Sequence, residues 1–539
     1  MEILFFLISS LLLFTNHQQL HCSAVATHKL EYPYSFMTVD AGKAAARTYD
    51  YIVVGGGAAG CPLAATLSQH YSVLLVERGD SPYGNPDVQD IKGVFKAFGD
   101  PSEFPYVMQG FVSEEGVQLV RGRVLGGSTA INAAFYSRAS SEFIREMEWD
   151  EKLVNESYEW VEKMNAFEPD KIFRWNSAFK DALLEAGVFP YNGYTLDHLE
   201  GTKIGASTID NEGRRHTAAD LLQYANPDNI VVLLNATATR ILFDSSSGML
   251  KASGVEIQSG GDEIIYQVFI SHLSHWSEVI LSAGAIGSPQ LLLLSGIGPS
   301  EHLDELNITV LLDVKLVGKR IQDPPRTSII LESPEPLDFE QAQIVGIIDN
   351  SQVIIEAASF FKQQNASKYQ YIGGMFSKVA FPLSRGELRL SSKNPQDNPF
   401  VRYNYFSHPF DVQECILAVK VFSNLTMTTS IQEFTFSGSG NSKMLQFIGP
   451  ELPQNKIEDD ALEKFCKDTV TTFWHYHGGC EVNYVIDKTL RVKGVDNLRV
   501  VDNSIFKDIP GTNPQATTMM LGRYTGVHIL QERLNICQY

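Results

Sequence analysis

The stretch Tyr51-Ile-Val-Val-Gly-Gly-Gly-Ala-Ala-Gly60 decides the fold of the amino-terminal part of the chain. Its first four residues are apolar and rich in β-branched side chains, which predicts a buried strand. A helical pattern follows the glycines, so the order is strand, tight turn, helix. In such a turn Gly55 permits the bend, Gly57 lets the backbone approach a pyrophosphate, and Gly60 allows close packing of helix on strand. The stretch therefore predicts a dinucleotide-binding fold.

A second apolar run supports dinucleotide binding over a merely structural glycine turn. Ser72 to Val76 ends in Glu77, at about the distance where an acidic residue holds a ribose hydroxyl. Further buried strands of the same fold are predicted at 231–234, 279–282 and 498–501. Residues 343–378 and 386–403 alternate like a sheet with loops. The proline-containing polar segment 321–337 is expected to run over the surface between domains.

Composition and charge exclude several classes of protein. The 539 residues are 44% hydrophobic and 20% charged, which suits a large globular core. The net charge of -20 repels phosphate backbones and the chain has no basic run, so a nucleic-acid partner is not expected. The six cysteines include no C-x-x-C pair, so no metal site is predicted. No stable membrane insertion is expected beyond the ambiguous amino terminus.

The amino terminus resembles a secretory signal. Residues 1–14 form a short apolar core, and polar then small residues follow, so residues 1–24 are predicted to be a cleaved signal peptide. Glu2 departs from the usual basic start, which leaves a buried or anchoring helix as the alternative. Five N-x-S/T sequons agree with a secreted, glycosylated protein, with the cell wall or vacuole as compatible destinations; they are Asn155, Asn235, Asn307, Asn365 and Asn424.

Two longer motifs resemble one known family. Arg121-Gly-Arg-Val-Leu-Gly-Gly-Ser-Thr-Ala-Ile-Asn132 and the stretch 284–298, GAIGSPQLLLLSGIG, match the two characteristic motifs of the glucose-methanol-choline (GMC) family of FAD oxidoreductases. Downstream, WHYHGGC at 474–480, LRVVD at 498–502 and PGTNPQ at 510–515 resemble the family's carboxy-terminal region. Within the family the chain looks most like plant hydroxynitrile lyases, of the (R)-mandelonitrile lyase type, and HOTHEAD-like proteins.

The resemblance implies an α/β protein, α+β overall. A Rossmann-like FAD-binding domain would be interleaved with a substrate domain built on an antiparallel sheet. We expect the FAD-binding domain at 45–140, 201–320 and 460–539, and the substrate domain at 141–200 and 321–459. The resemblance also suggests a disulfide between Cys415 and Cys466, a pairing that cysteine spacing alone cannot select.

FAD is the cofactor that the resemblance implies. The glycine turn would contact it through Gly55, Gly57, Ala58, Ala59 and Gly60, and the ribose through Glu77 and Arg78. The isoalloxazine is expected along Val124, Ser128, Asn132, Ala133, Ala134 and Phe135. Further contacts carry over to Ala238, Trp474, Asp502, Asn503, Pro514 and Gln515. The family usually has Gly or Ala at the position of Asn503, so this side chain must point away from the cofactor.

The catalytic pair carried over from the family is His475 with Asn513. His475 would remove a hydroxyl proton while a hydride passes from the same carbon to flavin N5, a role that suits an imidazole with an ordinary pKa of about 6.5. Asn513 can hydrogen-bond a substrate oxygen but cannot accept a proton. Phe473, Trp474 and His475 are expected to line the substrate site. The aromatic surroundings favour an aromatic or long-chain alcohol.

Three functions remain open at this point. The first is an alcohol oxidoreductase, with oxygen or an external carrier as electron acceptor. The second is a hydroxynitrile lyase that cleaves a cyanohydrin with FAD in a non-redox role. Well-known plant lyases, however, have histidine at the position of Asn513, tyrosine at that of Phe473 and a cysteine near 352–356. The third is a catalytically silent secreted flavoprotein. A monomer is expected in each case.

Overall fold

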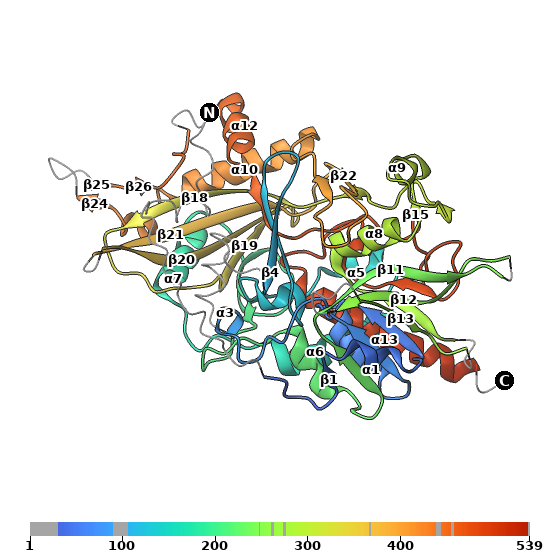
Figure 1. Cartoon of the computed structure of the whole chain (residues 1–539). Helices are drawn as coiled ribbons and strands as arrows, with labels where there is room; N and C mark the ends of the chain where they lie inside the picture. The colour runs from blue at the N-terminus through green and yellow to red at the C-terminus, as the bar shows by residue number, and fades with distance from the viewer. Residues whose placement is uncertain are drawn as a thin grey trace.

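The protein is described here by a computed structural model that covers residues 31–89, 106–246, 248–259, 264–272, 276–365, 368–437, 443–453 and 458–536. The predicted signal peptide at 1–24 lies outside these residues. The described chain forms two large sheets, each assembled from distant parts of the sequence (Figure 1). This mixed α/β architecture confirms the fold class expected from the sequence.

The glycine-rich stretch forms the expected strand, turn and helix at the centre of a parallel sheet. Strand β2 (Tyr51–Val54) leads into α2 (Gly60–Leu67) and then β3 (Val73–Val76). The sheet has six strands in the order β1-β10-β3-β2-β14-β28, all parallel. Its other strands are β1 (Met37–Thr38), β10 (Ile230–Leu233), β14 (Glu278–Leu281) and β28 (Leu498–Val500). All three additional strands predicted for this fold are therefore confirmed.

The parallel sheet is covered on its faces, as its continuous apolar strands require. Helix α13 (Gln515–Ile536) packs on α2 so closely that a methyl group at Gly522 would lie 2.1 Å from the carbonyl oxygen of Ala59. An antiparallel ribbon of β11 (Ala236–Asp244), β12 (Lys251–Ser259) and β13 (Ile265–Phe269) lies beside β14. Helix α8 (Gly284–Leu294) follows β14 directly.

The second sheet has eight strands, almost all antiparallel. Its order is β26-β18-β21-β20-β19-β8-β7, and β27 pairs with β18 beside β26. The strands are β7 (Tyr191–Tyr194), β8 (Gly201–Ile204), β18 (Pro325–Ser333), β19 (Ile344–Ile348), β20 (Val353–Asn365), β21 (Lys368–Val379), β26 (Gln446–Phe447) and β27 (Thr471–Thr472). In Figure 1 its long strands β18, β20 and β21 lie at the left, with helices α10 (Pro409–Leu425) and α12 (Asp459–Thr469) above them.

Strand periodicity gives this sheet two different faces. One face buries Ile329, Ile355 and Met375 in a core shared with α10 and with Trp175 of helix α7 (Arg174–Glu185). The opposite face carries Val345, Ile347 and Ile354, which pack with Phe135 from the nucleotide-binding part. The second face is therefore the one that meets the cofactor fold.

The expected surface course of residues 321–337 is wrong. Most of this segment is β18, and nearly all of its side chains are buried in the second sheet. Its polar residues have partners inside the protein, since the hydroxyl groups of Thr327 and Thr469 lie 2.7 Å apart. Pro325 is tolerated because it occupies the first position of the strand. Proline and polar residues do not distinguish a surface segment from a buried strand whose polar groups form hydrogen bonds inside the protein.

Two domain boundaries also differ from those expected. Strand β8 was assigned to the FAD-binding domain, but it pairs with β19 of the second sheet. Helix α12 and strand β27 were also expected in the FAD-binding domain. Strand β27, however, pairs with β18, and α12 packs on α10. The Cys415–Cys466 disulfide, which the structure confirms, joins these two helices. Hydrogen bonding and the disulfide therefore place 201–204 and 459–472 with the substrate sheet.

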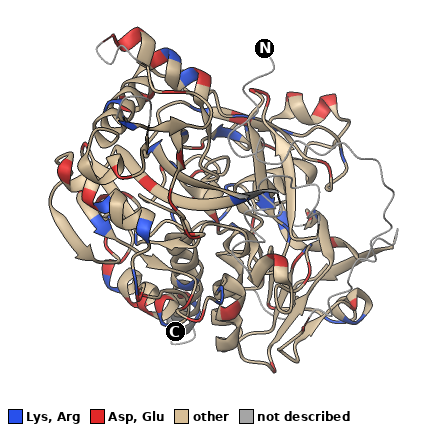
Figure 2. Cartoon of the chain, turned by 90° about the vertical axis from the view of Figure 1, so that its left-hand side faces the viewer, with Lys and Arg blue, Asp and Glu red and all other residues tan. Residues whose placement is uncertain are grey.

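Charged side chains of both signs are mixed over the surface of the described residues (Figure 2). Lysine and arginine are interspersed with aspartate and glutamate over the side shown in Figure 2. On α12, for example, Lys464 pairs with Asp468 and Lys467 with Glu463. Within the described ranges we find no helix that combines the length and apolar character needed to cross a bilayer.

Candidate active site

The glycine turn has the geometry that its three roles require. Gly55 has φ +107°, and a Cβ atom there would lie 2.4 Å from the carbonyl oxygen of Ser282. A Cβ atom at Gly60 would lie 1.9 Å from the carbonyl oxygen of Gly55, so only glycine allows the helix to start here. At Gly57 the nearest atom to such a Cβ is 3.8 Å away, because this position borders a cavity. The turn thus combines two packing glycines with one open to a ligand.

A cavity of about 710 Å³ extends from this turn to the second sheet. Its volume lies in the range of small-molecule and cofactor sites. Of the predicted cofactor residues, the structure places these in its lining: Gly55, Gly57, Ala58, Ala59, Glu77, Arg78, Ser128, Asn132, Ala133, Ala134, Phe135, Ala238, Trp474, Asp502, Asn503, Pro514 and Gln515. Gly60 and Val124 lie outside the lining; Gly60 packs the helix on its strand, and Val124 is buried in a small core. Phe473, His475 and Asn513 also line the cavity.

Glu77 and Arg78 stand at one end of the cavity, where the ribose is expected. The two carboxylate oxygens of Glu77 accept the backbone N–H groups of Gly56 and Gly79 at 2.9 and 2.8 Å. Burial raises the pKa of Glu77, against the lowering effect of these N–H groups. Arg78 donates to the carbonyl oxygen of Gly122 and to Gln109. Both side chains are therefore fixed before any ligand binds.

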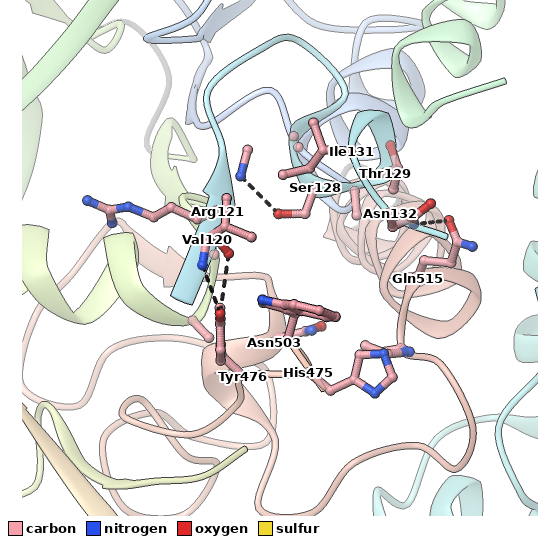
Figure 3. A pocket seen from close by; sticks show the side chains of 18 of the residues that line it. Val120, Arg121, Ser128, Thr129, Ile131, Asn132, His475, Tyr476, Asn503 and Gln515 are labelled. Carbon is pink, nitrogen blue, oxygen red and sulfur yellow. Dashed lines mark hydrogen bonds between the residues drawn. The ribbon is translucent and has the colours of Figure 1, made fainter. Parts of the chain in front are cut away.

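The middle of the cavity lies between two stretches that are far apart in sequence. Figure 3 shows Ser128, Thr129, Ile131 and Asn132 on one side, and His475, Tyr476 and Asn503 on the other. Across the site, Asn132 Nδ2 donates to Gln515 Oε1 at 2.8 Å (Figure 3). The Tyr476 hydroxyl oxygen accepts a hydrogen bond from the backbone N–H of Val120 at 3.2 Å. These bonds tie the two sequence motifs into one rigid wall.

Asp502 and Asn503 connect the carboxy-terminal motif to the neighbouring helices. One oxygen of the Asp502 carboxylate accepts the N–H of Gly284, at the start of α8, at 3.0 Å. The side-chain oxygen of Asn503 accepts a hydrogen bond from the hydroxyl group of Thr518 in α13. This bond occupies the Asn503 oxygen within the protein, which explains how a side chain is accommodated where relatives have glycine or alanine.

His475 and Asn513 come together as the sequence predicted. Their Nε2 and Nδ2 atoms lie 3.4 Å apart. His475 is 8% exposed, and its backbone N–H donates to Asp323 Oδ1 at 2.9 Å. Burial, together with nearby Lys378 and His477, holds the pKa of His475 well below its usual value. A neutral imidazole facing an amide inside a cavity can accept a proton from a bound hydroxyl group.

Sequence reasoning missed three charged residues at the same site. Arg326, Glu356 and Lys378 are almost completely buried and lie on or beside the cavity wall formed by β18, β20 and β21. The Lys378 Nζ atom lies 3.2 Å from His475 Nδ1. A signal was available, because Glu356 interrupts the apolar run VIIEAA at 353–358. A charged residue inside such a run indicates either a mispredicted strand or a functional site.

The residues around the cavity fit an FAD molecule. Gly57 and Gly284 both line the cavity, and a Cβ atom at either would have no neighbour within 3.7 Å. The backbone at these positions is therefore exposed to a ligand, while Glu77 and Arg78 supply polar groups at one end. Asn513 Oδ1 is buried and has no partner among the described residues. Over the same residues we find no cluster of His, Cys, Asp and Glu that could hold a metal ion.

Comparison with known proteins agrees with this geometry. Sequence profiles of the GMC oxidoreductase family match residues 49–326 and 382–522, most of the chain. An (R)-mandelonitrile lyase-like protein of Arabidopsis thaliana is 45% identical over 505 residues, with 90% of each chain covered. A sinapyl alcohol oxidase of Nesocodon mauritianus is 46% identical over 504 residues, covering 90% of this chain and 89% of its own.

A solved structure shares the fold. The chain superposes on a fungal aryl-alcohol oxidase with a TM-score of 0.72 at 19% identity, covering 90% of this chain and 99% of the oxidase. The glycine turn, the cavity between it and the second sheet, and these matches agree with one another. The chain belongs to the GMC oxidoreductase family of FAD-binding flavoproteins.

Proposed function

We propose that this protein oxidises the CH–OH group of an aromatic or long-chain apolar alcohol, with His475 as the base. The observation that carries the proposal is the pairing of His475 Nε2 with the amide of Asn513 in the wall of the cavity. One group can accept a proton, and the other can only orient an oxygen. This division of roles is what removal of a single hydroxyl proton requires.

The reaction uses the chain's own residues to position and deprotonate the alcohol. Bound FAD supplies the hydride acceptor. Asn513 hydrogen-bonds the hydroxyl oxygen, and His475 Nε2 receives its proton as the carbonyl forms. The Asp323 carboxylate holds the backbone of His475 in place. Oxygen or an external carrier would be the final electron acceptor. We propose that the protein acts as a monomer.

The cavity wall supports an aromatic or otherwise apolar substrate. Six phenylalanines line the cavity: Phe135, Phe339, Phe360, Phe361, Phe376 and Phe473. Phe473 lies beside the base, with ring centroids of Phe473 and His475 5.0 Å apart. Aromatic side chains at such distances favour stacked or edge-on contacts with another ring. A sugar, by contrast, would leave hydroxyl groups unpaired against this surface.

Hydroxynitrile lyase activity is the second candidate. Arg326 and Lys378 place two cationic side chains near His475, and a positive site would stabilise departing cyanide. Glu356 lies among them, however, and offsets part of this positive charge. The chain also lacks the second histidine, the tyrosine and the cysteine that the well-known plant lyases use. These differences favour the oxidoreductase.

Anaerobic mixing separates these candidates. The purified flavoprotein is mixed with a panel of aromatic and long-chain alcohols, and separately with racemic mandelonitrile, while flavin absorbance and cyanide are followed. Bleaching by an alcohol without cyanide release is the expected result. Cyanide release from an unbleached flavin would replace the oxidoreductase with the lyase. If neither bleaching nor cyanide release is observed, the catalytically silent flavoprotein is the remaining candidate.

We also propose that the protein is secreted and glycosylated. Asn155, Asn307 and Asn424 are exposed, as an acceptor asparagine must be. Asn235 is different, because its amide donates to Asp80 Oδ2 at 2.8 Å. We therefore expect glycans at the three exposed sites and none at Asn235. Peptide mass spectrometry after enzymatic deglycosylation checks this, and a glycan on Asn235 would contradict the assignment.

A further inference from the structure

The sheet face that borders the cavity carries several charged side chains, and three of them, Arg326, Glu356 and Lys378, lie on neighbouring strands. Arg326 of β18 pairs in register with Lys378 of β21, which pairs with Ile354 of β20. Glu356 lies two residues beyond Ile354 and therefore points to the same face. Arg326 and Glu356 are each 5% exposed and Lys378 is 1% exposed. Strand register thus places the carboxylate of Glu356 and the basic side chains of Arg326 and Lys378 on one face, close to His475.

Lys378 lies in direct contact with the base. Its Nζ atom is 3.2 Å from His475 Nδ1, on the side of the ring away from Asn513. Lys378 also donates to the carbonyl oxygen of Thr512, the residue before Asn513. The lysine is therefore held against both halves of the catalytic pair. The proposed alcohol oxidation assigns Lys378 no role.

The protonation state of Lys378 decides what His475 can do. An ammonium group can only donate, so it requires Nδ1 to accept and places the proton of a neutral imidazole on Nε2. In that tautomer His475 cannot take a proton from a substrate at Nε2. A neutral amine can accept a hydrogen bond from Nδ1–H instead, and the Nε2 lone pair beside the Asn513 amide can then accept a proton. Base catalysis at Nε2 therefore needs an uncharged Lys378.

We propose that Lys378 is a positioning residue that acts as a neutral amine behind His475, and that Glu356 controls how readily it becomes charged. The inference rests on the proposed alcohol oxidation. As the substrate O–H bond breaks, a new N–H bond forms at Nε2 and the Nδ1 proton passes to Lys378 Nζ. The carbon loses its hydrogen as hydride, with its electron pair, to the oxidant, which is the bound flavin. Lys378 ends as an ammonium beside Glu356, and the charges balance.

The surroundings of Lys378 set the direction of the expected pH dependence. Burial lowers the pKa of Lys378 to about 8, against the opposing effect of the carboxylates of Glu356 and Asp323. Lys378 in turn lowers the pKa of both His475 and His198. Because Glu356 stabilises the ammonium form, its removal lowers the pKa of Lys378 further. Without Glu356, the neutral amine of Lys378 is therefore present at a lower pH than in wild type.

Arg326 is the third charged residue of this group, and its positive charge opposes protonation of Lys378. Burial raises the pKa of Glu356, against the lowering effects of Lys378, Arg326 and a hydrogen bond with the Asn513 side chain. Without Glu356, the fixed charge of Arg326 would still oppose protonation of Lys378. Arg326 therefore cannot restore what Glu356 supplies, and replacement of Glu356 lowers the pKa of Lys378.

The first test compares the pH profile of anaerobic flavin reduction by a substrate alcohol in wild type and Glu356→Gln. The rate should rise with pH in wild type, and the rising limb should move to lower pH by about one unit or more in the variant. At a pH below the wild-type limb, the variant is then about tenfold faster. If Glu356→Gln binds no flavin, Glu356→Asp replaces it and should show a smaller shift. Coincident profiles would overturn the inference.

A matched control is available on the same sheet. Glu332 lies on β18, on the same face as Arg326, and its carboxylate accepts the amides of Gln370 and Gln446 instead of facing a lysine. Glu332→Gln should leave the pH profile unchanged. An equal shift in both variants would mean that total charge, and not the charge of Glu356 near Lys378, moves the profile.

A second readout does not depend on turnover. Nitrogen-15 NMR of histidine-labelled protein reports which ring nitrogen of His475 carries the proton. We expect the proton to move from Nε2 to Nδ1 as pH rises in wild type, and no such change in Lys378→Met. A proton that stays on Nε2 throughout the range would refute the role of Lys378. If no alcohol bleaches the wild-type flavin while the NMR transition is present, the proposed reaction fails but the lysine switch stands.

Discussion

Replacement of Gly57 by valine tests whether the cavity at the glycine turn is the cofactor site. The structure places the nearest atoms to a Cβ at this position 3.8 and 4.0 Å away, on Gly127 and Ser282. A Cβ atom therefore makes only ordinary van der Waals contacts at this position, which borders the cavity. We expect the apoprotein to keep its stability within about 0.5 kcal/mol. The valine methyl groups would block the approach of the pyrophosphate, so the purified variant should be colourless.

The magnitude follows from the linkage between binding and folding. At a free FAD concentration of one hundred times its dissociation constant, binding stabilises a protein by about 2.7 kcal/mol. Urea denaturation with and without added FAD should show this gain in wild-type apoprotein and none in Gly57→Val. Gly60→Ala is the contrasting variant, because its Cβ would lie 1.9 Å from a backbone oxygen and should destabilise the fold itself. A yellow Gly57→Val protein that FAD still stabilises would refute the placement.

Three further predictions concern the base, the disulfide and a buried histidine. His475→Ala should lower the rate of alcohol-dependent flavin bleaching by about 10²- to 10⁴-fold while flavin stays bound, and an unchanged rate would remove it from catalysis. Replacing both Cys415 and Cys466 by alanine opens a loop with a sequence separation of 51 residues, so chain entropy predicts a loss of about 4 kcal/mol in urea denaturation. Burial lowers the pKa of His198 to about 3, so the unfolded chain binds its proton first and stability from this group is lost as pH falls from 6.5 toward 3. His198→Phe should therefore show a smaller fall in urea midpoint between pH 7 and pH 4 than wild type, and parallel falls would contradict this assignment.

Local sequence was sufficient for the parallel sheet and much of the cofactor site. Strands β2, β3, β10, β14 and β28 are continuous apolar runs, so their burial could be read directly. The His475–Asn513 pair was expected from the resemblance, and the structure brings the two side chains within 3.4 Å. The surface course predicted for residues 321–337 is wrong, because its proline and polar residues are also compatible with the buried strand β18. Their hydrogen-bond partners lie far away in the chain and could not be read from the segment itself.

The sequence by itself determined the glycine turn, the parallel strands and the family. These features depend on neighbours a few residues apart, whose spacing is visible in one dimension. Only the tertiary structure decided that Arg326, Glu356 and Lys378 share one face of the second sheet beside His475. That arrangement depends on strand register, and a shift of one residue would turn each side chain to the opposite face. Register follows from the packing of the whole sheet against its helices and the cofactor fold, and so the environment of the base could not be read from the sequence.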